Sequence, residues 1–262
     1  MASEEPEKLA EGTLISHLLE LRDRVLRAFL AVLVAFLPCA FYSNKIFSFI
    51  AQPLLAKLPK DSSLIATSVI SPFMTPFKLS FFVGLFIAMP VVLYQAWAFV
   101  APGLYSHEKK LVLPLVISST VLFFVGVAFC YFFVFGQVFK FIQSFAPKSI
   151  TAAPDIEAYL SFVMTMFIAF GAAFEVPVVV VVLARVGLVS VEKLRQFRSY
   201  FIVIAFIIAA VITPPDIVSQ LALAIPMCLL YEAGIWAAQI FIKHTQAPAE
   251  SDGASSNSSS SS

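Results

Sequence analysis

The chain has 262 residues and a formal net charge of +1, with 60% hydrophobic and only 13% charged residues. A soluble domain holds about 45–50% apolar and about 25% charged residues, so this composition, with a mean hydropathy of +0.92, indicates a polytopic membrane protein. The near-neutral charge argues against the dense basic surface of a nucleic-acid-binding protein, and we expect no nucleic-acid partner.

Residues 1–24 form a polar segment in front of the first apolar run. The segment is rich in Glu where a secretory signal peptide is basic, and no A-x-A-like cleavage site follows, so we expect the apolar run to stay as a helix. Within this segment, Glu20 and Arg24 have the i, i+4 spacing of an ion pair on a solvated helix end. Spacing alone does not decide whether Glu20 has any further role.

Six apolar segments between 25 and 242 predict an all-α bundle of six transmembrane helices, since a span needs about 20 apolar residues. The fifth holds only about 15 residues, or roughly 22 Å of helix, so it should thin the bilayer or sit inside the fold. The sixth is also short, because polar residues and Pro226 interrupt it. The predicted spans are 25–42, 77–99, 111–135, 158–184, 199–213 and 217–241.

The distribution of the 17 Lys and Arg residues predicts the orientation. Most of them fall on the side of the N-terminus, and the positive-inside rule then places both termini in the cytoplasm. The external loop 43–76 mixes prolines with apolar residues, so we expect short amphipathic helices over the outer ends of the spans. The tail 243–262 ends in SSNSSSSS and is predicted to be a disordered cytoplasmic linker, of a kind also typical of an added tag.

Catalytic motifs are missing from the sequence. The three histidines lie in predicted cytoplasmic segments, no Walker A loop exists, and the three cysteines sit in separate apolar runs. We therefore expect no enzyme activity, no metal and no cofactor, which leaves transport, reception or scaffolding.

Glu175 is the carboxylate with the strongest claim to a function in the membrane. It precedes Arg185 by about 15 Å of helix, near the bilayer midplane, where an ionised side chain costs about 2.5–3.5 kcal/mol. Such residues usually face a protein interior, a cavity or a partner. The alternative is a protonated Glu that is hydrogen-bonded within the bundle, beside backbone freed by Pro177. Gln220 is a weaker signal of the same kind, either a contact within the bundle or a contact with a partner.

Five motifs in order carry a resemblance to a known family. They are SHLLELRDR (16–24), SPFMTPFKL (71–79), YQAWAFVAPGLYSHEKK (94–110), YLSFVMTMFIAFGAAFEVPV (159–178) and TPPDIVSQLALAIPM (213–227). Together they resemble the TatC family, the polytopic receptor of the twin-arginine protein translocase in the bacterial cytoplasmic (inner) membrane. The resemblance runs from about residue 13 to 241 and leaves out the acidic N-terminus and the serine tail.

The resemblance implies a binding site for the paired arginines of a signal peptide on folded precursor proteins. Glu20 and Glu108 would be its acidic receptors, and Arg22 would support the N-terminal segment. The first cytoplasmic loop would be shaped by Phe99, Pro102 and Leu104. A carboxylate suits this role because it accepts two parallel N–H···O bonds from a guanidinium, a fork that Lys cannot copy.

The resemblance also implies roles inside the membrane. Glu175 would line a concave face of a glove-like bundle, where the apolar part of the signal peptide or a partner's single helix inserts. Contacts with the single-span proteins TatA and TatB would involve Gln220 and, at the preceding turn, Thr213, Pro214 and Asp216. Pro53 would brace the external loop, the proton-motive force would supply energy, and the receptor complex would contain several copies in contact with membrane lipid.

A rival hypothesis from another class is a proton-coupled small-solute transporter that uses Glu175 as its proton carrier. It predicts solute uptake by this chain alone in liposomes, whereas the receptor hypothesis predicts none. A purely structural membrane anchor would leave Glu20 and Glu108 as solvated charges.

Overall fold

The computed structural model describes residues 5–55, 65–100, 112–145, 155–213 and 216–245. Nearly all of this described part is helical, as the composition predicts. The elements are α1 (Glu5–Phe41), α2 (Ser43–Leu55), α3 (Ser71–Val100), α4 (Val112–Phe129), η3 (Cys130–Val134), α5 (Phe135–Phe145), α6 (Ile156–Ala173), α7 (Val176–Arg185), α8 (Val191–Gln196), α9 (Arg198–Ile212) and α10 (Ile217–Thr245).

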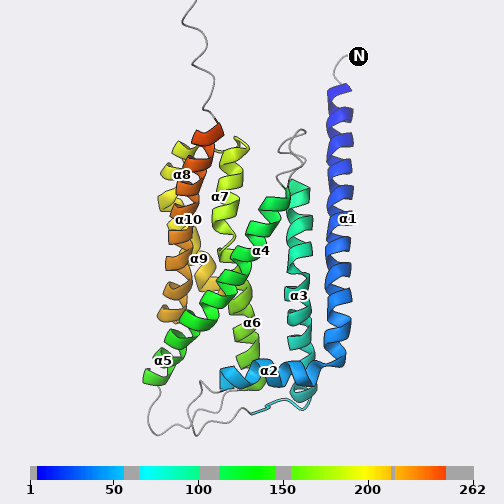
Figure 1. The fold of residues 1–262 in the computed structure, drawn as a ribbon, viewed down its shortest axis with the longest axis vertical. Coiled ribbons are helices and arrows are strands. Elements are labelled where there is room, and N and C mark those ends of the chain that lie inside the picture. The colour runs from blue at the N-terminus through cyan, green and yellow to red at the C-terminus, as the bar shows by residue number, and fades with distance from the viewer. Residues whose placement is uncertain (1–4, 56–64, 101–111, 146–154, 214–215, 246–262) are drawn as a thin grey trace, which may run out of the picture.

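Five stretches of the described chain are long and apolar enough to cross a membrane. They are Ile15–Phe41, Ser71–Val100, Val112–Val138, Ile156–Arg185 and Ile217–Ile240, and the shorter apolar helix Arg198–Ile212 accompanies them. The spans run roughly side by side, and the first and last helices have their terminal ends at the same end of the bundle (Figure 1). The helix α10 continues to Thr245, so it includes the first residues of the tail that we expected to be disordered.

The fourth predicted span, 158–184, is not one continuous helix. The helix α6 ends at Ala173, and α7 begins at Val176, with Pro177 in its first turn. Proline has no N–H and its ring crowds the preceding turn, which weakens a helix at that point and suits a helix start, although Pro76 and Pro90 lie inside the continuous helix α3. The break therefore falls just before Pro177, and Glu175 lies in it.

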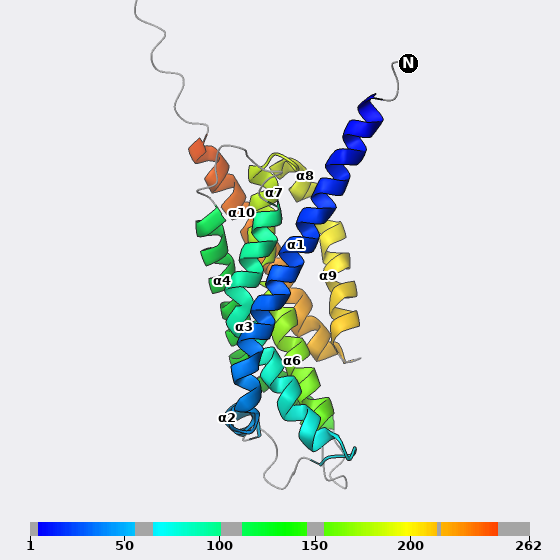
Figure 2. The same cartoon turned by 90° about the vertical axis from the view of Figure 1, so that its right-hand side faces the viewer.

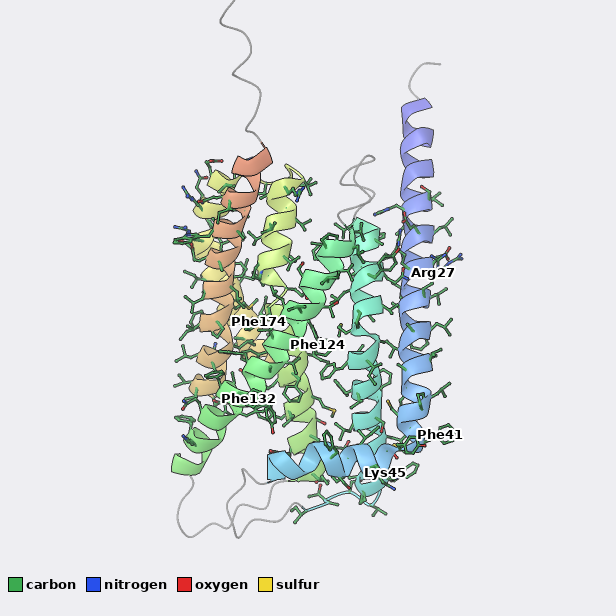
Figure 3. The ribbon with its side chains drawn as sticks, in the orientation of Figure 1. Arg27, Phe41, Lys45, Phe124, Phe132 and Phe174 are labelled. Atoms are coloured by element: carbon green, nitrogen blue, oxygen red, sulfur yellow. The ribbon has the colours of Figure 1, made fainter. Side chains whose placement is uncertain are left out.

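The helix α6 lies at the centre of the largest hydrophobic cluster. Its fully buried residues include Leu160, Val163, Met166 and Phe170, and they pack against α3, η3, α5, α9 and α10. The outer helix α1 is instead largely exposed, with Leu30 60% and Val34 61% accessible, as expected where a helix faces lipid (Figure 3). The bundle thus buries its middle span and presents α1 to the membrane.

Glycines mark the points where helices cross closely. A Cβ atom built at Gly84 of α3 would lie 2.8 Å from the Phe36 Cα of α1, and one at Gly126 of α4 would lie 2.5 Å from the Phe170 carbonyl oxygen of α6. Between membrane helices there is little hydrophobic driving force, so van der Waals packing holds them together, and small residues let their backbones approach closely enough for it. The contact at Gly84 fixes where α1 runs along α3 (Figure 2).

The helix α2 lies across the end of the bundle opposite the chain termini (Figure 1). It packs Ile46 and Phe47 against the core and leaves Asn44, Lys45 and Ser48 exposed, so an amphipathic helix is present in the segment between the first two spans, as expected. The end of this loop is fastened to the start of α6. Asp155 caps α6 by accepting from the Glu157 and Ala158 amides, and it also accepts from the Thr67 amide (3.0 Å) and hydroxyl (2.7 Å).

Glu157 completes this connection from the first turn of α6. It accepts a hydrogen bond from the Ser71 hydroxyl (2.6 Å) and pairs with Lys78 of α3. We call Thr67, Ser71, Lys78, Asp155 and Glu157 the loop clasp. Its bonds join segments that are more than 70 residues apart in the chain, so they hold the start of α3 against the start of α6.

Replacing Gly84 with Val should push α1 away from α3, because the added carbons would meet the Phe36 backbone. Overpacking of this kind costs about 1–3 kcal/mol. We expect a lower thermal unfolding midpoint in detergent for Gly84→Val. The matched control is Gly136→Val in α5, where a Cβ meets nothing within 4 Å; an equal loss for both variants would contradict the close contact.

The loop clasp should respond to acid through Asp155. Its hydrogen bonds with the Ala158 and Thr67 amides and the Thr67 hydroxyl lower the pKa of Asp155 to about 2 from a usual value of 3.8. The clasp should therefore be intact above pH 3.8 and lost as the pH falls through about 2. Protonation of Asp155 at that pH replaces its carboxylate with a neutral carboxyl group, which is a weaker acceptor. We expect Asp155→Asn to raise amide hydrogen exchange at Thr67 at neutral pH, and unchanged protection would contradict this role.

Candidate functional site

Glu20 and Arg24 form an ion pair on the side of α1 that faces α3. Both the Nε and the Nη2 atoms of Arg24 donate to the same oxygen, Glu20 Oε1, at 2.9 and 2.6 Å. The pair is half-buried, with side-chain exposures of 35% for Glu20 and 20% for Arg24. The i, i+4 pairing predicted from the sequence is confirmed, and it engages one carboxylate oxygen only.

The end of α3 lies beside this ion pair. The Phe99 ring stacks on the His17 ring with centroids 4.4 Å apart and an angle of 21° between the planes. His17 precedes Glu20 by three residues, so the two share one face of α1. Phe99 is therefore next to the Glu20 pair, one residue before α3 ends at Val100.

The other residues predicted for this site either lie on another face of α1 or fall outside the described part of the chain. Arg22 is exposed and pairs with its neighbour Asp23 (2.9 Å), on another face of α1 from Glu20. Glu108, Pro102 and Leu104 lie outside the described residues. Pro53 is in the last turn of α2, and its side chain is also outside the described part.

A second polar site lies inside the membrane around Glu175. Both of its carboxylate oxygens are buried, and no described group completes a hydrogen bond of normal geometry with either. The Ser119 hydroxyl of α4 is the polar group that interacts with this carboxyl. A carboxyl group without a full set of partners is costly in a low-dielectric interior, so the site is open to a further donor.

Ser119 itself is held by α3. The Trp97 indole Nε1–H donates to Ser119 Oγ at 2.8 Å, and Ser119 is fully buried. Around this bond, Trp97 and Val116 pack with Val178 and Val182 of α7. A serine hydroxyl has one donor and two acceptor positions, so the bond from Trp97 leaves the Ser119 proton available for Glu175.

Residues at the turn between α9 and α10 have local partners. The Thr213 hydroxyl donates to the Ala209 carbonyl (2.8 Å), and Asp216 Oδ1 accepts from the Ser219 amide (2.7 Å) in the manner of a helix cap. Gln220 Nε2 donates to the Phe206 carbonyl of α9 at 3.3 Å, a contact within the bundle. Pro214 lies outside the described residues.

These features define a polytopic all-helical membrane protein with an ion-paired carboxylate at one end and a buried carboxylate at a helix break. The model of the family described as "Sec-independent protein translocase protein (TatC)" matches residues 16–226. The chain belongs to this TatC family, whose members are components of a protein translocase and not enzymes.

Two relatives and one solved structure illustrate the similarity. A protein of Halothiobacillus neapolitanus named Sec-independent protein translocase protein TatC is 52% identical over 87% of this chain, which spans 63% of that relative's length. The Escherichia coli (strain K12) protein of the same name is 48% identical, with 87% of this chain and 89% of the relative covered. A crystal structure described as the twin arginine translocase receptor TatC is 40% identical and covers 86% of this chain and 98% of its own, with a TM-score of 0.76.

Sequence reasoning missed two contributors to these sites. His17 was not recognised as a neighbour of Phe99, although its i, i+3 spacing to Glu20 places both on one face. The Trp97–Ser119 bond joins residues of two spans, and only the unusual presence of Trp and Ser in apolar segments could have pointed to it.

Removing the Ser119 hydroxyl should destabilise the contact between α3 and α4. Ser119→Ala leaves the buried Trp97 N–H without a partner, at a cost of about 1–3 kcal/mol. We expect a lower unfolding midpoint and a changed Trp97 emission in a Trp236→Phe background. The matched control is Ser118→Ala, because the exposed Ser118 hydroxyl bonds only to its own helix at Leu115; equal effects would refute the assignment.

Proposed function

We propose that this chain is the receptor of the twin-arginine translocase and that it binds the paired arginines of signal peptides on folded precursors. In this proposal Glu20 receives one arginine and Glu108 the other, with Phe99, Pro102 and Leu104 shaping the loop and Arg22 supporting α1. The observation that carries it is the Glu20 carboxylate, which is partly accessible beside the end of α3 and has only one oxygen engaged.

The Arg24 pair is the resting state of this site. A partly exposed ion pair contributes only about 0–1 kcal/mol, so a competing guanidinium can displace or extend it at little cost. An incoming arginine that meets both Glu20 oxygens forms a bidentate pair, which is stronger than the present bonds to Oε1 alone. Lys offers a point charge without the fork, so the site should prefer Arg.

The membrane part of the receptor serves the other translocase components in this proposal. TatA and TatB contact Gln220 and the turn that contains Thr213, Pro214 and Asp216. The open carboxyl of Glu175 receives a polar group from an inserted helix. The short helix α9 favours local bilayer thinning as cargo passes. The chain resides in the bacterial inner membrane with its N-terminus cytoplasmic, Pro53 in the external loop and the proton-motive force as energy source.

Photo-crosslinking tests the recognition site. With a photoreactive residue beside Glu20 or Glu108, a twin-arginine precursor should crosslink to the full chain in membranes, and a twin-lysine precursor should do so much less. Losing a charged hydrogen-bond pair costs about 1.5–3 kcal/mol, so Glu20→Gln and Glu108→Gln should each weaken precursor binding by roughly tenfold or more.

Asp23→Asn is the matched control for Glu20→Gln. It removes an acid from the same helix, but Asp23 is exposed and pairs with Arg22 instead of facing α3. We expect this variant to bind precursor normally and all variants to insert into the membrane. Equal crosslinking of twin-lysine and twin-arginine precursors would overturn the proposed role of the carboxylates.

A further inference from the structure

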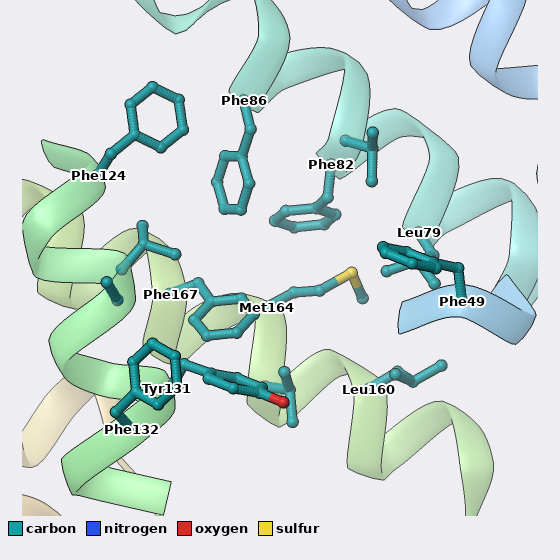
Figure 4. Close-up of a pocket in the computed structure, with 14 residues that line it drawn as sticks. Phe49, Leu79, Phe82, Phe86, Phe124, Tyr131, Phe132, Leu160, Met164 and Phe167 are labelled. Carbon is teal, nitrogen blue, oxygen red and sulfur yellow. The ribbon is translucent and has the colours of Figure 1, made fainter. Parts of the chain in front are cut away.

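An apolar groove opens between spans in the half of the bundle that carries α2 (Figure 4). It has a volume of about 470 Å³. Its walls come from α3, α4 and α6, η3 contributes Tyr131 and Phe132, and Phe49 of α2 stands at one end. Apart from the Tyr131 hydroxyl, every side chain that lines it is apolar.

The open side of this groove faces the membrane. Phe49, Phe124 and Phe132 at its rim are 81%, 40% and 70% exposed, while Leu160 and Val163 at its floor are almost fully buried. The π-helical turn η3 adds a residue to the span and brings Tyr131 and Phe132 to the groove. An empty groove would leave the side chains that line it without contacting atoms on one side, and the lost dispersion contacts would cost free energy. We therefore expect an occupant to fill the groove.

The size of the groove decides between two occupants. A helix with side chains is about 10–12 Å wide, so a volume near 470 Å³ holds only roughly 6 Å of it, about one turn. The groove therefore does not enclose a partner's transmembrane helix, which could only lie across its open side. A single acyl chain is slender and flexible, and the bilayer supplies it at high concentration.

A cation lies near one end of the groove. Lys45 precedes Phe49 by four residues on α2, so the two share one face of this helix. Its ammonium lies 5.5 Å from the Tyr42 ring centroid, and no carboxylate of the described residues forms an ion pair with it. A lysine at the membrane interface lays its stem on apolar surface and directs its charge to the headgroup region, where it attracts anionic phosphate.

We propose that the groove binds one acyl chain of a phospholipid from the leaflet on the α2 side, with Lys45 facing the phosphate of its headgroup. The lipid fills the space between α3, α4 and α6 on the α2 side of the buried Glu175 and connects α2 to the spans. This site is separate from the recognition end at Glu20 and does not depend on the receptor function.

A photoactivatable phospholipid tests the proposal. The probe is phosphatidylglycerol with a diazirine on one acyl chain, in liposomes of phosphatidylethanolamine that hold the full chain. We expect mass spectrometry to find the label concentrated on 127–132 and 160–167, above its level on the exposed positions of α1. Uniform labelling of the groove and α1 would mean ordinary lipid contact and would overturn the proposal.

Two variants locate the site. Ala128→Trp fills the groove from an exposed position and should abolish the concentrated label, and Val83→Phe blocks it independently from α3. The matched control is Ala233→Trp, at an exposed position of α10 outside the groove, which should leave the label unchanged. Persistent labelling in both groove variants would overturn the site.

The headgroup and the alternative occupant are tested in the same liposomes. Lys45→Gln should reduce the preference for phosphatidylglycerol over phosphatidylethanolamine about fivefold, since one Lys near an anionic headgroup contributes about that factor. An unchanged preference would remove Lys45 from the site.

If an added single-span translocase protein suppresses the groove label in proportion to its binding, a partner side chain is the occupant and the lipid proposal fails.

Discussion

The close approach of α1 to α3 at Gly84 determines where the Glu20 end of α1, the proposed recognition site, lies. From the contact at Phe36, α1 runs about 24 Å to Glu20, so a change of about 10° in its direction would move Glu20 by about 4 Å. The His17–Phe99 stack is a second contact farther along the same two helices. These two contacts together set the direction of α1 relative to α3 and hold Glu20 beside the end of α3. A bidentate bond needs this accuracy, because its geometry is narrow.

The last turn of α3 belongs to both polar sites. Phe99 contacts α1 through His17, whereas Trp97, two residues earlier and so on nearly the opposite face of the helix, bonds to Ser119 of α4. Ser119 in turn interacts with Glu175. A shift of this turn would therefore move the surroundings of both the Glu20 pair and the buried Glu175 carboxyl. The two sites share one rigid element although they lie at different depths of the membrane.

Patterns within one helix were predictable, and contacts between distant helices were not. Hydropathy predicted an all-helical membrane protein, and i, i+4 spacing predicted the Glu20–Arg24 pair, because both depend on neighbouring residues. Pro177 signalled a disturbance, but only the structure shows the break at Glu175 instead of a continuous helix. His17 and Phe99 are far apart in the chain, and a resemblance can name Phe99 as part of the loop without giving its partner. Side-chain contacts of this kind follow from helix packing, which periodicity does not encode.

The two ends of the bundle are held by interactions of different strength. At the α2 end, Asp155 caps α6 with two local hydrogen bonds and accepts two more from Thr67, and Glu157 bonds to Ser71 and Lys78, so four of these six interactions link separate segments. At the Glu20 end, the ion pairs of α1 join residues within the same helix, and each contributes little. A cooperative network resists rearrangement, whereas a weak local pair can be exchanged for an incoming charge. The clasp thus fixes α3 against α6 at the α2 end, whereas the charges of α1 at the other end are exchangeable, as the proposed reversible recognition of a charged peptide would require.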